Sequence, residues 1–215
     1  MDEKTRAKLY RTAKGFGGLF WAVLLIIASM LCLEKTRLGW KALQLICLAF
    51  VLPLAEGFMA LRHAEPLRCR RGMLRLAIAL AIVVAYLTPL MVSWRLAPRQ
   101  PFLTWNVVAY YLASIALLFV ECRLVREYAA WLPDATLVAE ANLVSGMVLL
   151  LAVLGVGLLW YVLRDWPDRS LVSLGIGLLS LSAEARLLLL LPFLVAGYLF
   201  LLARRTVLNR LLTAE

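Results

Sequence analysis

Six long apolar stretches dominate the pattern of hydrophobic and polar positions along the chain. Each approaches or exceeds the roughly 17–25 residues that cross a hydrocarbon core about 30 Å thick. Backbone amides in lipid must be satisfied within their own segment, so stretches of this length form helices. The pattern therefore predicts an all-α, polytopic transmembrane helical bundle that forms a single integral membrane domain over 1–215. The six predicted spans are 16–33, 42–61, 76–94, 102–120, 143–163 and 187–203.

A shorter apolar segment leaves the number of spans open. Residues 170–181 number only twelve, a length typical of a re-entrant or interfacial segment. Ser182 can then cap a last helix that has Glu184 in its first turn, where a negative charge is favourable. This interpretation gives six spans. If the segment crosses the membrane instead, the chain has seven.

Basic residues predict the orientation. In the six-span arrangement, 15 of the 23 Lys and Arg residues fall on the side that carries both termini and 8 on the other. An excess of Lys and Arg marks the cytoplasmic face. We therefore expect both termini to be cytoplasmic, in a cytoplasmic (inner) membrane of bacterial type. Five of the seven tryptophans lie at predicted outer helix ends, where indoles favour the headgroup region: Trp40, Trp94, Trp105, Trp160 and Trp166.

Composition and charge exclude two other classes of protein, a soluble domain and a nucleic-acid-binding protein. Hydrophobic residues make up 64% of the chain, against about 45–50% in a soluble domain. The net charge of +10 is split among tails and loops beside the spans, which favours contact with the lipid bilayer and its anionic headgroups and argues against nucleic acid. With little mass outside the membrane, a protein partner or a homo-oligomer is expected.

Glu56 is the most informative single residue, because it is the one ionisable residue deep inside an apolar stretch. A charged side chain at the centre of a span costs about 2.5–3.5 kcal/mol on insertion scales, so such residues usually face a bundle interior or a water-filled cavity. Pro53, three residues earlier, frees the carbonyl of Ala49 and bends the helix. Glu56 and Pro53 are therefore candidate intramembrane functional residues. The alternative is an interfacial carboxylate paired with Arg62 or Arg75.

Further candidates are charged residues near the predicted helix ends. Glu56, Glu121 and Glu184 recur at intervals of about 64 residues, each closely followed by an Arg, which indicates an internal repeat unless helix ends simply collect charges of both signs. This pattern makes Glu121, Arg123, Glu184 and Arg186 weaker candidates. An arginine-rich loop is a candidate contact for lipid headgroups or a partner: Arg62, Arg68, Arg70, Arg71 and Arg75.

Motifs for catalysis or metal binding are missing from the sequence. His63 is the only histidine, the four cysteines lack C-x-x-C spacing, and neither a serine nucleophile elbow nor a phosphate-binding loop appears. We therefore expect no cofactor, no metal and no catalytic centre. The predicted function is transport or a role as a membrane subunit of a larger assembly. The alternative is an intramembrane enzyme that acts on a lipid or lipid-linked substrate.

One predicted helix carries a packing signal. Ala77, Ala81 and Ala85 recur every four residues on one face of the third span. Small residues at this spacing let helix backbones approach closely in a membrane. We therefore expect this alanine face to be a helix contact.

Overall fold

The computed structural model describes residues 3–35, 40–62, 71–132, 134–164 and 170–213, and within these ranges the chain is helical apart from short turns and caps. The predicted all-α class is therefore confirmed for the described part of the chain. The helices are α1 (Glu3–Lys35), α2 (Trp40–Leu48), α3 (Val51–Leu61), α5 (Arg71–Leu96), α6 (Pro101–Trp131), α7 (Ala135–Arg164), α8 (Leu171–Leu179) and α9 (Ala183–Thr213).

Within the described ranges, six helical segments are long and apolar enough to cross a membrane, and each contains most of one predicted apolar stretch. The chain is thus a multi-pass membrane protein. The largest difference from the sequence prediction lies between the fourth and fifth spans, where most of the expected connection continues α6 and begins α7. The six segments are Thr5–Leu31, Gln44–Leu61, Arg71–Leu96, Pro101–Trp131, Ala135–Val162 and Ala183–Thr213.

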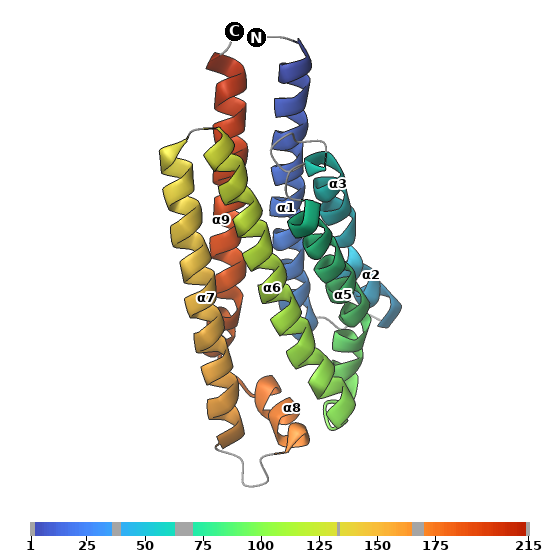
Figure 1. The fold of residues 1–215 in the computed structure, drawn as a ribbon. Coiled ribbons are helices and arrows are strands. Elements are labelled where there is room, and N and C mark those ends of the chain that lie inside the picture. The colour runs from blue at the N-terminus through green and yellow to red at the C-terminus, as the bar shows by residue number, and fades with distance from the viewer. Residues whose placement is uncertain (1–2, 36–39, 63–70, 133, 165–169, 214–215) are drawn as a thin grey trace.

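The helices form an elongated bundle in which α1 begins and α9 ends at the same end (Figure 1). Packing between α1 and α9 is the most extensive contact, and α1 also packs against α3. Helix α6 packs against α5 on one side and against α7 on the other, while α7 returns to α9. Helices α1 and α9 therefore join the group formed by α2 and α3 to the group formed by α6 and α7.

The second span is broken into two helices. Helix α2 ends at Leu48, a turn occupies Ala49 and Phe50, and Pro53 lies in the first turn of α3. Because Pro53 has no amide hydrogen, the carbonyl of Ala49 loses its helical donor. The bend predicted from Pro53 is therefore present, as a break rather than as a gentle kink.

Residues 170–181 do not cross the bundle. Ser170 caps α8, since its hydroxyl accepts a hydrogen bond from the Ser173 amide at 3.2 Å. Ser182 caps α9 as predicted, accepting from the Ala185 amide at 3.3 Å. Helix α8 is nine residues long and packs against α6 and α7 at the end of the bundle away from both chain ends (Figure 1). The described structure thus favours six spans over seven.

Two close approaches fix the position of neighbouring elements. A Cβ atom on Gly18 of α1 would lie 2.6 Å from the Pro53 carbonyl oxygen and 2.8 Å from the Gly57 Cα of α3. A Cβ atom on Gly175 of α8 would lie 2.5 Å from the carbonyl oxygen of Pro98, just before α6. Only glycine permits backbones to come this close.

The alanine face of α5 packs as predicted, with Ala77 fully buried and Ala81 against the core, while Ala79 is exposed. We expect Ala81→Leu to lower the free energy of unfolding by about 1 kcal/mol, because the larger side chain overpacks the contact. Ala79→Leu is the matched control and should change it by less than about 0.5 kcal/mol. Thermal unfolding in detergent measures both. Equal effects would contradict a packing role for this face.

Candidate functional site

Glu56 lies on the outer surface of the bundle, with 54% of its side chain exposed. Its carboxylate pairs with Lys14 of α1 at 2.5 Å, rather than with Arg62 or Arg75. The close packing of α1 on α3 brings these two side chains together. This site is an exposed ion pair between two helices, and neither residue belongs to the lining of the cavity near α8 that is described below.

We expect Glu56→Gln to change the free energy of unfolding by no more than about 1 kcal/mol, because ion pairs this exposed contribute about 0–1 kcal/mol. Lys14→Gln is the matched control, since it removes the same pair from the other side. In the double variant, the loss of free energy of unfolding should not exceed the sum of the losses in the two single variants. A loss well above this range, measured by thermal unfolding, would show that Glu56 has a larger structural role.

The other predicted charged residues are spread over the molecule. Arg123 is exposed, with its guanidinium 5.2 Å from the centre of the Phe119 ring. Glu184 is exposed in the first turn of α9. Arg62, Arg71 and Arg75 are exposed around the end of α3 and the start of α5, whereas Arg68 and Arg70 lie outside the described residues.

Among the residues whose burial the structure describes, Glu121 is the buried carboxylate. It is 1% exposed, and its Oε1 atom has no hydrogen-bond partner among the described residues. The apolar stretch ends at Val120, which placed Glu121 at a helix end in the sequence analysis, but α6 continues to Trp131. A signal for this continuation is present in the sequence, because apolar or weakly polar residues recur beyond Glu121. The structure buries them: Cys122, Leu124, Val125, Tyr128 and Ala129.

The regular spacing of Glu56, Glu121 and Glu184 therefore does not correspond to a shared environment. Glu56 is on the surface and Glu121 is in the interior. Glu184 begins α9, at the end of the bundle away from the chain ends (Figure 1). The described structure does not bring the three residues into one site.

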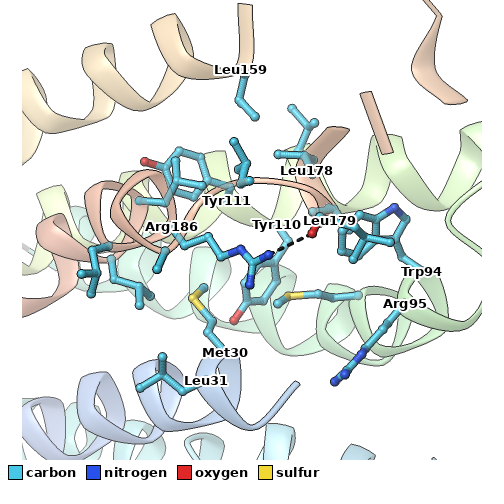
Figure 2. Close-up of a pocket in the computed structure, with 18 residues that line it drawn as sticks. Met30, Leu31, Trp94, Arg95, Tyr110, Tyr111, Leu159, Leu178, Leu179 and Arg186 are labelled. Atoms are coloured by element: carbon cyan, nitrogen blue, oxygen red, sulfur yellow. Dashed lines mark hydrogen bonds between the residues drawn. The ribbon is translucent and has the colours of Figure 1, made fainter. Parts of the chain in front are cut away.

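A cavity of about 500 Å³ lies near α8. Its walls come from α1, α5, α6, α7, α8 and α9, and most of the lining is aliphatic or aromatic (Figure 2). Representative lining residues are Met30, Met91, Tyr110, Leu159, Leu178 and Leu190. A volume in this range is typical of small-molecule sites, which are about 300–1,000 Å³.

The polar side chains among the lining residues are two arginines, two tyrosines and a tryptophan: Arg95, Arg186, Tyr110, Tyr111 and Trp94. The Nη2 atom of Arg186 donates a hydrogen bond to the Leu179 carbonyl oxygen at 2.9 Å, which ties the guanidinium to α8 (Figure 2). Arg95, in the last turn of α5, also lines the cavity. The indole Nε1 of Trp94 is buried without an acceptor among the described residues. An apolar space with these donors is suited to a molecule that has a hydrocarbon part and an anionic group.

Asp134 connects the turn between α6 and α7 to α9. Its Oδ1 atom accepts hydrogen bonds from the Thr136 hydroxyl at 2.6 Å and from the Leu137 amide at 3.0 Å. These bonds, Thr136 first, hold the pKa of the Asp134 carboxyl below its usual value. Its Oδ2 atom lies 3.8 Å from the Arg210 guanidinium. This carboxylate caps α7 and so has a structural role.

No group of three or more His, Cys, Asp or Glu side chains in the described ranges could hold a metal ion. Comparisons with protein-family models, curated proteins and solved structures find no match to this chain. The functional argument therefore rests on the cavity and the buried groups of the chain itself.

Proposed function

We propose that this multi-pass membrane protein has no catalytic centre of its own and binds an anionic, lipid-like molecule in the cavity beside α8. Its role is transport of that molecule or lipid-dependent support of a larger membrane assembly. The observation that carries the proposal is an apolar cavity of about 500 Å³ whose lining includes Arg186 and Arg95.

The chemistry of the lining favours an amphiphile over a small polar solute. A polar solute leaves its hydrogen-bonding groups unsatisfied against aliphatic walls, at a cost of roughly 2–7 kcal/mol per group. A hydrocarbon chain meets no such cost, and a guanidinium binds carboxylate or phosphate groups through paired hydrogen bonds. Arg186 is already oriented by its bond to Leu179, so little side-chain freedom is lost when an anion binds.

The orientation is part of the proposal. With both termini cytoplasmic, the cavity opens near the outer leaflet. A reporter fused after Glu215 should then read cytoplasmic, and one inserted near Pro98 should read outside. The reverse readings would place the cavity near the inner leaflet, with a different pool of lipids.

Lipid extraction from the purified protein, followed by mass spectrometry, tests the binding. We expect an anionic lipid to co-purify with the wild-type protein and to be depleted in Arg186→Gln. Arg123→Gln is the matched control, because Arg123 is an exposed arginine of α6 away from the cavity lining, and it should retain the lipid. Equal retention in both variants would reject the assignment. Chemical turnover of the bound lipid would instead support the intramembrane enzyme.

A further inference from the structure

Helix α6 carries three buried polar side chains on one face. Ser114, Glu121 and Tyr128 are each at most 2% exposed. The hydroxyls of Ser114 and Tyr128 lie near those of Tyr110 and Thr12, respectively, whereas the Oε1 atom of Glu121 has no hydrogen-bond partner among the described residues. The spacing of seven residues between successive members corresponds to nearly two helical turns, so they lie about 10.5 Å apart along one face. Unpartnered polar atoms are rare in folded interiors and call for an explanation.

Glu121 is the costly member of this set. An isolated carboxylate charge in such surroundings either takes up a proton or is matched by a cation. Helices α5, α7, α8 and α9 pack against α6, and α1 reaches it through the contact of Phe16 with Tyr128. The titratable neighbours of Glu121 along α6 are the buried thiol of Cys122, the partly buried carboxyl of Glu127 and the phenol of Tyr128, and the basic residues there are the exposed Arg123 and the partly buried Arg126. Charged groups on the other helices of the bundle include Lys14, Arg71, Arg75, Glu140, Arg204, Arg205 and Arg210.

Several of these charged groups are engaged or directed elsewhere. Lys14 pairs with Glu56 and Arg210 faces Asp134. Arg71 and Arg75 are exposed, and α8 carries no charged residue. Among the described residues Glu121 forms no ion pair, and its Oε1 atom accepts no hydrogen bond.

A bound metal cation fits this position poorly. Hard cations need several oxygen ligands at once, about six for Mg²⁺ and 6–8 for Ca²⁺. Ser114 and Tyr128 lie too far along the helix to share a cation with Glu121, and the described residues contain no cluster of acidic ligands. A proton needs only one carboxyl oxygen.

We propose that Glu121 is a proton-binding site in the membrane interior, reached from the end of the bundle where both chain ends lie, along the face of α6 that carries Tyr128. Tyr128 is one turn from the end of α6, with its hydroxyl near Thr12 of α1. Its ring packs edge-on against Phe16, 5.3 Å between centroids. Because the steps along α6 exceed a hydrogen bond, transfer needs bridging water that enters between the helices.

Infrared spectroscopy of the purified protein at neutral pH tests the proton. We expect a C=O stretching band of a protonated carboxylic acid in the wild-type protein. The band should be lost in Glu121→Gln and retained in Glu56→Gln, which changes an exposed carboxylate. Glu121→Met, an apolar side chain of similar length, is the second variant and should also lose the band while the protein stays folded. A spectrum that is unchanged by both Glu121 substitutions would overturn the proposal.

Transfer into D₂O tests the route. Exchange of the Glu121 proton shifts the band, and the shift should develop more slowly in Tyr128→Phe than in the wild-type protein. Tyr86→Phe is the matched control, because Tyr86 of α5 is 74% exposed, and it should exchange at the wild-type rate. Equal rates in all three proteins would overturn access along Tyr128.

Discussion

Gly18→Ala should lower the free energy of unfolding by about 3 kcal/mol, near the upper end for overpacking a well-packed contact. The added methyl group meets the Pro53 carbonyl oxygen and the Gly57 Cα, at 2.6 and 2.8 Å. Both are backbone atoms, so no side-chain rotation relieves the clash. Helix α3 has to move away from α1, and the broken second span loses its main support.

Gly146→Ala is the control for this substitution. Gly146 lies in α7, and a Cβ atom there meets nothing within 4 Å. Alanine is better than glycine inside a helix by about 0.8–1.0 kcal/mol, so this variant should be as stable as the wild-type protein or slightly more so. Thermal unfolding in detergent compares the two. If Gly18→Ala is as stable as Gly146→Ala, the close approach of α1 and α3 does not exist in solution.

Gly175→Ala should displace α8 and empty the cavity. The new methyl group would lie 2.5 Å from the Pro98 carbonyl oxygen and 2.5 Å from the Thr104 Oγ1 atom. Since Leu178 and Leu179 of α8 line the cavity, a shift of this helix opens one wall. It also moves the carbonyl that holds Arg186. We expect loss of the bound lipid together with a stability cost of about 1–3 kcal/mol.

Gly157→Ala is the matched control, because Gly157 of α7 has open space at its Cβ position. Lipid analysis and thermal unfolding should be performed on the same preparations. If Gly175→Ala retains lipid at the wild-type level, the position of α8 is not needed for lipid binding in the cavity. Lipid lost equally in Gly157→Ala would point to a general effect of handling rather than to the cavity wall.

The spans could be predicted from sequence because the bilayer imposes one requirement on every crossing segment, a long apolar helix. The same requirement explains why the sequence analysis predicted a long connection between the fourth and fifth spans, where the structure has the end of α6 and the start of α7. Hydropathy marks where a helix leaves the hydrocarbon, but a helix continues beyond it when its side chains pack on neighbours. Leu124, Val125 and Ala129 are fully buried in such an extension, and the alternation of charged and apolar residues there hid it.

The candidate site could not be predicted as well as the spans, because lipid-facing and interior positions are both apolar in a membrane protein. Glu56 stands out in hydropathy but is exposed, whereas Glu121 looked interfacial and is buried. The partner Lys14 and the cavity residues come from distant segments, and only the packing of helices brings them together. Arg186 was found as a weak candidate for its place beside Glu184, but its bond to Leu179 depends on α8.

The pairing of α1 with α9 has a consequence for how the protein is made. At about 5–20 residues per second, a ribosome finishes α9 roughly 10–40 s after α1. During that interval α1 is in the membrane without the helix that forms its most extensive contact. The packing of the nascent chain is therefore incomplete until α9 inserts. Truncation within α9 should be cleared from cells far more readily than the loss of a single loop.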